Sequence, residues 1–226
     1  MNNDKDIFAL ETIKELKNYN NYVFKKLSNF LIHGKGLDYG CGLGGFIKFI
    51  NNIEGFKFTG YDINKNVIKN LEINNIPIKT SLENVNSQYE NVVSINVLEH
   101  IVNDVEVLKN IYKILKNKGR LILYIPNSDK LWTELDDSVG HVRRYSKINI
   151  TDKLINNGFE IVHFEYVDYI GSLVIRFSKI LKISLSFNNS FIVFYDKFIF
   201  KFCKYLDLFF KNSQGKNILI VADARK

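Results

Sequence analysis

Alternating glycines between residues 36 and 46 constrain the fold of this chain more than any other feature. Gly40, Gly42 and Gly44 follow a short apolar run that contains Asp38, and apolar side chains at helical spacing begin at Phe46. This order predicts a strand, a glycine turn and a helix. Glycine is needed where the backbone takes a positive φ or where a ligand approaches closely, and the first N–H groups of the helix would face that ligand. A plain strand-to-helix turn without a ligand is the alternative.

Two carboxylates indicate which ligand the turn would bind. The glycines alone also fit the dinucleotide fingerprint, through Gly40, Gly42 and Gly45. Asp38 precedes the first of them by two residues, where it would repel a pyrophosphate and attract a cation. Asp62 follows the next apolar run, where an acid can accept hydrogen bonds from both ribose hydroxyls. We therefore expect S-adenosylmethionine as the cofactor; an NAD-dependent oxidoreductase is the alternative.

Four motifs, in order, resemble those of class I S-adenosylmethionine-dependent methyltransferases. They are residues 37–44, Asp62, residues 96–100 and residues 115–121. The chain resembles most the small bacterial members related to the ubiquinone-biosynthesis type (type 11/12), over nearly its whole length. The resemblance implies an α/β, Rossmann-like fold: a seven-stranded, mostly parallel sheet with helices on both faces and an antiparallel last strand.

The resemblance also implies a cofactor site. Asp38 would bind the methionine amino group, directly or through water, and Asp62 the ribose hydroxyls. Tyr22 lies in an N-terminal segment that closes over the cofactor in the family, although ordinary packing against the sheet also explains an aromatic residue there. The predicted cofactor-binding residues are Tyr22, Asp38, Gly40, Cys41, Gly42, Gly44, Asp62, Ile63, Asn96 and Val97.

The predicted acceptor side contains histidines and arginines. His100 or His141 could take a proton from an acceptor hydroxyl, whereas the alternative for His100 is a hydrogen bond that orients its loop. Arg143, Arg144 and Tyr145 are predicted to bind an anionic acceptor, because guanidinium groups suit carboxylates and phosphates; a solvated basic turn is the alternative. No set of Cys, His or carboxylate residues has metal-ligand spacing, so we expect no metal.

The chain is predicted to form one methyltransferase domain over residues 1–226. Apolar periodicity alternates between helical and strand patterns along it, with a long loop at residues 127–146 and a helix at about 190–211. On that last helix a broad aromatic face would cover the acceptor cavity; a dimer interface or a membrane surface are the alternatives. The four expected parts are an N-terminal helical segment (1–33), the cofactor-binding core (34–169), a helical acceptor-side cover (170–215) and the final strand (216–226).

The net charge of +7 lies at one end of the sequence. Residues 1–141 contain 17 Lys/Arg and 17 Asp/Glu, whereas residues 142–226 contain 14 and 7. This asymmetry suggests an acidic partner, such as a phosphorylated acceptor or an anionic membrane surface; a lysine-rich composition with no partner is the equal alternative. No recognisable nucleic-acid motif is present, so a nucleic-acid partner is not expected.

Cysteine usage and hydropathy predict a cytoplasmic protein that could also contact the inner face of the membrane. Cys41 and Cys203 lie far apart, no apolar leader follows Met1, and no uncharged apolar run approaches the ~20 residues of a membrane span. The expected function is methyl transfer from S-adenosylmethionine, with an oxygen of a small-molecule, sugar or lipid-linked acceptor favoured by analogy alone. A non-catalytic partner that binds the cofactor is a further alternative.

Overall fold

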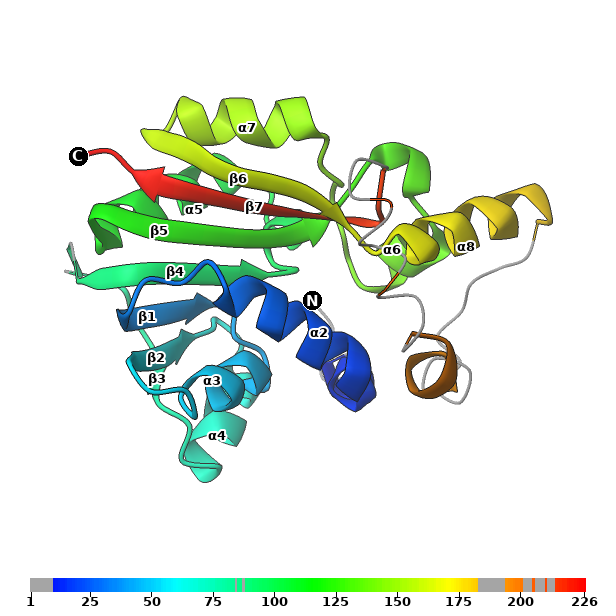
Figure 1. Cartoon of the computed structure of the whole chain (residues 1–226). Helices are drawn as coiled ribbons and strands as arrows, with labels where there is room; N and C mark the ends of the chain where they lie inside the picture. Colours follow the sequence, from blue (N-terminus) through cyan, green and yellow to red (C-terminus); the bar gives the residue numbers. More distant parts are fainter. Residues whose placement is uncertain are drawn as a thin grey trace.

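The computed structural model describes residues 10–83, 85–86, 88–182, 194–200, 205, 210 and 214–226. Its centre is a seven-stranded sheet with the order β3-β2-β1-β4-β5-β7-β6 (Figure 1). The strands are β1 (Gly34–Tyr39), β2 (Phe56–Tyr61), β3 (Ile78–Lys79), β4 (Tyr89–Ile95), β5 (Leu115–Pro126), β6 (Phe159–Val167) and β7 (Asn217–Ala224).

Strands β1 to β5 pair in parallel, and β7 lies antiparallel between β5 and β6. The predicted Rossmann-like sheet with an antiparallel last strand is therefore confirmed. Strand β7 is buried along nearly its whole length, which explains why its sequence is a continuous apolar run and does not alternate. Parallel pairing brings the carboxyl ends of β1, β2 and β4 to one edge, where ligands bind in open α/β sheets.

Helices cover both faces of the sheet. On one face α2 (Lys17–Ser28), α3 (Gly45–Ile50) and α4 (Lys65–Ile73) share an apolar cluster with side chains of β4, β5 and β7. On the other face α5 (Asp104–Ile114) and α7 (Lys147–Ile155) share a second cluster with the same strands. Each strand thus contributes alternate side chains to the two clusters, which fixes its register relative to the helices.

The long loop predicted at residues 127–146 contains short helices. The 3-10 helix η2 (Asp129–Leu131) and the helix α6 (Glu134–Ser138) lie within it. Asp136 starts α6 by accepting hydrogen bonds from the backbone N–H of Thr133 at 2.7 Å and from its hydroxyl at 3.1 Å. This capping arrangement makes the segment an ordered part of the site.

The C-terminal helices lie beyond the carboxyl edge of the sheet (Figure 1). Helix α8 (Tyr169–Ile180) follows β6, and a π-helical turn, η3 (Tyr195–Ile199), packs against α2. Asp196 of that turn accepts hydrogen bonds from the backbone N–H groups of Asn18 and Tyr19. Most of the helix predicted at residues 190–211, and with it the continuous aromatic face, falls outside the described residues. No helix in the described ranges has the length and hydropathy to cross a bilayer.

Candidate active site

The glycine turn joins β1 to α3 at the carboxyl edge of the sheet. Gly40, Gly42 and Gly44 have φ values of 76°, 49° and 71°, in the left-handed region where other residues are strained. A Cβ at position 40 would also lie 2.4 Å from the side chain of Val97. Two neighbouring strand ends are therefore in close contact only because position 40 has no side chain.

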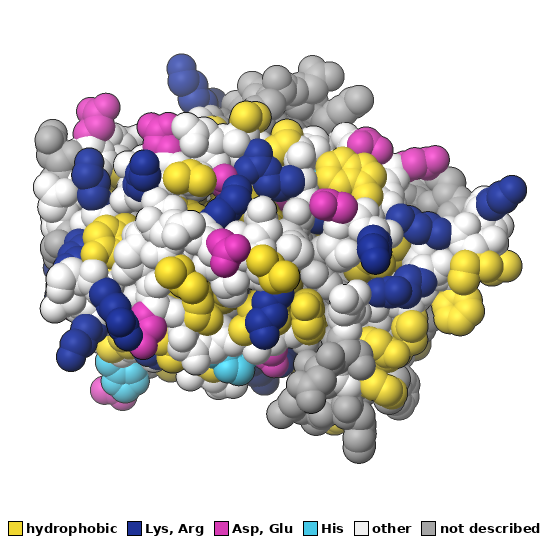
Figure 2. All heavy atoms as spheres, turned by 90° about the horizontal axis from the view of Figure 1, so that it is seen from above, with side chains coloured by type: hydrophobic (Ala, Val, Ile, Leu, Met, Phe, Trp, Pro, Cys, Tyr) yellow, Lys and Arg dark blue, Asp and Glu magenta, His cyan; other side chains and the backbone are white. Residues whose placement is uncertain are grey.

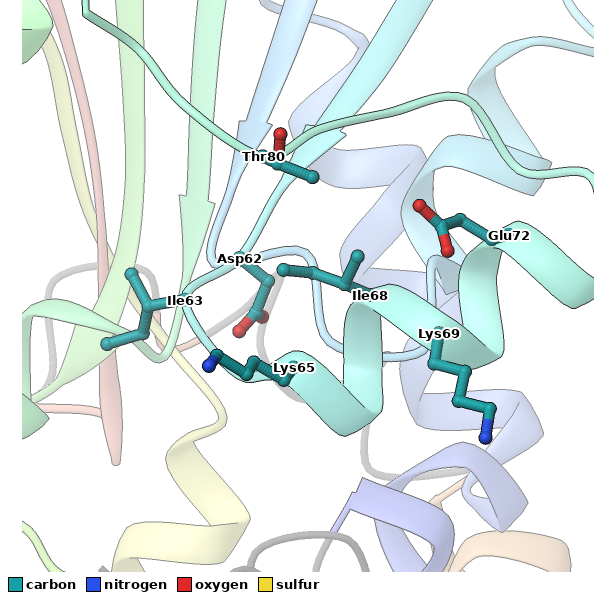
Figure 3. A pocket seen from close by; sticks show the side chains of 7 residues that line it. All are labelled: Asp62, Ile63, Lys65, Ile68, Lys69, Glu72 and Thr80. Carbon is teal, nitrogen blue, oxygen red and sulfur yellow. The ribbon is translucent and has the colours of Figure 1, made fainter.

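Asp62 holds the glycine turn from the end of β2. One of its carboxylate oxygens accepts the backbone N–H of Gly42 at 3.1 Å, and the other accepts that of Asn64 at 2.9 Å. Each oxygen keeps acceptor capacity, so the carboxylate can also receive ribose hydroxyls. It lies at a cavity of about 480 Å³. Figure 3 shows the side chains that line this cavity: Asp62, Ile63, Lys65, Ile68, Lys69, Glu72 and Thr80.

Asp38 is the second acid of the turn, and it is buried. Burial and the nearby charge of Asp62 raise its pKa to about 8. A carboxyl group in this position gains from a cation, since the cation favours the ionised form. The same burial, with the charges of Asp38 and Asp62, raises the pKa of the Cys41 thiol, which therefore stays protonated and packs in the core. These residues fit a cofactor that carries positive charge.

The remaining residues of the predicted cofactor site surround the turn. Asn96 follows β4 with a φ of 52°, and Val97 packs against Gly40. Ile63 is 74% exposed at the cavity, where a flat ligand could cover it. Tyr22 meets Phe200 edge to face, with ring centroids 5.5 Å apart. This is the packing alternative for Tyr22, and its contact with the cofactor stays a prediction.

Two of the three residues predicted to bind the acceptor have structural roles. Arg144 is buried and donates two hydrogen bonds to the carboxylate of Asp136, at 2.8 and 2.9 Å. Tyr145 is completely buried, and its hydroxyl lies 2.8 Å from Asp104. Both use their polar groups to fold the loop, and the contact of Arg144 and Tyr145 with an acceptor stays a prediction. Arg143 pairs with Asp104 at 2.7 Å but keeps a quarter of its side chain exposed.

The two predicted catalytic histidines lie side by side. The rings of His100 and His141 meet edge to face, with centroids 4.7 Å apart. Nδ1 of His141 lies 2.7 Å from Asp136, and in the neutral tautomer that donates this hydrogen bond Nε2 has a lone pair. Burial would raise the pKa of Asp136, but hydrogen bonds from His141 and Arg144 and the charge of Arg144 outweigh it and hold this pKa well below its ordinary value.

Glu99 completes this group, although it was not among the predicted site residues. It is fully buried in the 3-10 turn η1 (Leu98–His100), and one of its oxygens lies 3.8 Å from Nε2 of His141. Burial raises its pKa to about 8, against the opposing effects of a backbone hydrogen bond and the charge of Arg144. The only sequence signal for Glu99 is its place directly after a buried strand and beside a histidine.

Comparison with known proteins identifies this arrangement. A family model described as a methyltransferase domain matches residues 14–164, which include the glycine turn, Asp62 and the Asn96–His100 segment. The chain belongs to this methyltransferase family. The cofactor of this methyltransferase is S-adenosylmethionine, which agrees with the glycine turn and the two acids around it.

Relatives of this methyltransferase lie at moderate sequence distance. An uncharacterized protein of Methanocaldococcus jannaschii is 32% identical over 66% of this chain and 64% of its own length. A ubiquinone biosynthesis O-methyltransferase of Rickettsia bellii is 32% identical over 49% of this chain and 50% of that enzyme. The matches thus span about half to two thirds of the length of these relatives. A solved methyltransferase of Archaeoglobus fulgidus shares the fold, with a TM-score of 0.60 and 20% identity over 90% of this chain and 94% of that one.

Proposed function

We propose that this protein transfers the methyl group of S-adenosylmethionine to an oxygen of a small-molecule, sugar or lipid-linked acceptor. The observation that supports it most is the position of Asp62, whose two oxygens each hold one N–H group of the turn region and can still receive ribose hydroxyls. Asp38, two residues before Gly40, supplies the negative charge that favours a cationic methyl donor over a pyrophosphate.

In the proposed reaction the chain mainly binds and aligns. S-adenosylmethionine supplies an activated methyl group, and S-adenosylhomocysteine is released. Asp62 would orient the ribose, the glycine turn would admit the cofactor to the backbone, and Asp38 would hold the amino group. Alignment of the acceptor oxygen with the methyl carbon accounts for most of the catalysis of such a displacement. His100 and His141 would face the acceptor hydroxyl and govern the loss of its proton.

The acceptor is proposed to be anionic or attached to a membrane surface. Arg143 at the acceptor loop and the excess of basic residues after position 141 support the first property. Helix α8 supports the second, because its exposed apolar side chains lie among Arg176, Lys179 and Lys182. Figure 2 shows hydrophobic and basic side chains together at this end of the molecule. The exposed apolar residues of α8 and its C-cap are Val174, Phe177, Ile180 and Leu181.

Cofactor binding tests the proposal directly. In calorimetry the protein should bind S-adenosylmethionine and S-adenosylhomocysteine, and both should raise its melting temperature by mass action. Asp62→Ala should weaken binding by about 1.5–3 kcal/mol, the usual value for hydrogen bonds to a charged group. Glu72→Ala is the matched control, since Glu72 lines the same cavity from α4 but holds no N–H group of the turn. Binding of NAD in place of both adenosyl compounds would refute the proposal.

Transfer itself is tested with a labelled methyl donor. The protein is incubated with cell extract, and labelled products are identified by mass spectrometry. We expect label in a compound that carries an anionic group, as a methyl ether or ester. Cofactor binding without label in any extract would favour the non-catalytic alternative.

A further inference from the structure

Three groups that commonly bind metals converge beyond the end of β4. One ring nitrogen each of His100 and His141 and a carboxylate oxygen of Glu99 all lie within 4.8 Å of one another. Glu99 and His100 follow β4 by a few residues, whereas His141 comes from the loop after β5. A hydrogen bond of 2.8 Å from the backbone N–H of Val142 to the carbonyl of Glu99 ties the two segments together. The convergence is thus built by the backbone.

Glu99 has an unmet need for a positive partner. Its side chain is completely buried, and neither carboxylate oxygen receives a hydrogen bond from another of the described residues. The buried guanidinium group of Arg144, whose charge acts on Glu99, donates its hydrogen bonds to Asp136 and to the carbonyl of Asn127. A buried carboxylate without a partner is strongly unfavourable, and metal coordination is one of the few ways to satisfy it. This is the observation that separates the group from an ordinary cluster of polar residues.

The surroundings of His141 are those of a metal ligand. Its Nδ1 lies 2.7 Å from the carboxylate of Asp136, and its Nε2, on the other side of the ring, lies 3.8 Å from an oxygen of Glu99. A ligating histidine nearly always donates its other N–H to a carboxylate or carbonyl in this way. Asp136 is itself held by Thr133 and Arg144, so the imidazole is fixed before any ion arrives. His141 also keeps about a seventh of its side chain exposed, which gives an ion access.

We propose that Glu99, His100 and His141 bind a divalent transition-metal ion, best matched by Zn²⁺. Two imidazoles and one carboxylate form a ligand set found at catalytic zinc sites, in which one position stays open. Ligands at about 2.0–2.2 Å from one ion lie within about 4.4 Å of each other. The separation of 3.8 Å between Nε2 of His141 and the Glu99 oxygen is within this limit, and the three donor atoms together span up to 4.8 Å, so the site would contract slightly around an ion. The sequence predicted no metal, because His141 is far from the other two ligands along the chain.

In the reaction this ion would take the place of a general base, a role that rests on the proposed methyl transfer. The acceptor hydroxyl would occupy the open position, and the ion would lower its pKa, so that its proton passes to water. The resulting oxygen anion would form the O–CH3 bond as the S–CH3 bond breaks, and both electrons of the broken bond would stay on the sulfur of S-adenosylhomocysteine. Val97, which touches Gly40, connects the cofactor turn to the turn that carries Glu99 and His100.

Zn²⁺ titration of the full chain, purified without a histidine tag and dialysed against chelator, tests the site without any acceptor. We expect one Zn²⁺ per chain, with affinity lowered at least about 100-fold by Glu99→Gln, His100→Gln or His141→Gln. His33→Gln is the matched control, because His33 is an exposed histidine that lies outside the cluster. Co²⁺ should give a visible absorption band that the His100→Gln and His141→Gln variants lose.

Cofactor affinity serves as the check on folding. Variants that keep wild-type affinity for S-adenosylhomocysteine are folded, and His100→Gln, in a partly exposed position, keeps the test valid if Glu99→Gln does not fold. Absence of Zn²⁺ binding, or binding that all three folded variants retain, would overturn the site. Zn²⁺ binding without methyl transfer would leave the site standing and count against the proposed function. Full transfer after chelation would overturn the role of the ion in the reaction.

Discussion

At the scale of single residues, this methyltransferase concentrates unusual carboxylates at one edge of the sheet. Asp38 and Glu99 are buried with raised pKa values, whereas Asp136 has a lowered one. The difference follows from their partners. Asp136 receives hydrogen bonds from Arg144, His141 and Thr133. For Asp38 and Glu99 burial is the largest effect, and the charge of Arg144 only partly offsets it at Glu99. Groups held in such unfavourable states gain most from a bound cation.

The buried state of Asp38 predicts a pH dependence of cofactor binding. Without cofactor its pKa is about 8, raised by burial and by Asp62, so at pH 6 to 7.5 it is mostly protonated. The amino group of the cofactor favours the ionised form, so binding should release a proton. The cofactor binds the ionised form of Asp38, and the fraction of ionised Asp38 rises with pH below its pKa. The affinity for the cofactor should therefore increase by roughly three- to tenfold per pH unit between pH 6 and 7.5.

Calorimetry in buffers of different ionisation enthalpy measures this proton release. The neighbouring Cys41 thiol does not titrate in this range, because burial and the nearby carboxylates raise its pKa far above it. Asp38→Asn is therefore expected to abolish the pH dependence. A wild-type affinity that does not change over this range would remove Asp38 from contact with the amino group.

At the scale of elements, the turn between β1 and α3 depends on contact with the segment after β4. Gly40 and Gly140 have the same φ of 76°, but a Cβ would meet the side chain of Val97 at position 40 and nothing within 4 Å at position 140. Alanine at Gly140 would therefore introduce backbone strain alone, whereas alanine at Gly40 would introduce the same strain and a steric clash. The two glycines differ in function as well, because only Gly40 lies in the cofactor turn.

Alanine at these two glycines should therefore have different effects. Gly140→Ala should lower the free energy of unfolding by about 1–2 kcal/mol, the strain of a left-handed residue, and leave cofactor affinity unchanged. Gly40→Ala should cost clearly more and weaken cofactor binding, since the clash displaces Val97. Denaturant unfolding and calorimetry of both variants test this. Val97→Ala added to Gly40→Ala should restore part of the loss, and strict additivity of the two changes would contradict the clash.

At the scale of the whole molecule, charge and exposed apolar surface coincide at the end that carries α8. The exposed apolar side chains of α8 lie among basic residues, beyond the carboxyl edge of the sheet that holds the cofactor site (Figures 1 and 2). A patch of this composition suits an anionic surface. The arrangement would bring a lipid-linked acceptor close to the site.

Flotation with vesicles that contain anionic lipid tests this orientation. Wild-type protein should float at low salt and less at high salt, and the double variant Phe177→Ser/Ile180→Ser should float poorly. Ile148→Ser is the control, because Ile148 on α7 is 73% exposed, like Ile180 at 74%. Equal flotation of all three proteins would contradict the role of α8. Light scattering on the same samples would detect the dimer alternative.

The sequence alone determined the parts of this protein that depend on local patterns. The glycine turn, the strand before it and the acid at the end of β2 lie within short stretches, so glycine spacing and apolar periodicity were enough to predict this strand, turn and helix. The resemblance of these motifs to a known family implied the rest of the sheet. Element ends were less well predicted. Helix α5 ends at Ile114 and β5 starts at Leu115, because strand pairing between Tyr89 and Leu115 ends a helical pattern that local periodicity would continue.

Only the tertiary structure decided which polar side chains of the acceptor loop serve the fold and which face the site. Arg144 and Tyr145 are residue types that often bind an anionic acceptor. In the structure, however, Arg144 is hydrogen-bonded to Asp136 and Tyr145 to Asp104, which is 41 residues away in the sequence. Glu99 and His141, separated by a comparable length of chain, come together in the same way. The partner of a polar group depends on which buried surfaces meet, and this is settled by long-range packing that local sequence patterns do not encode.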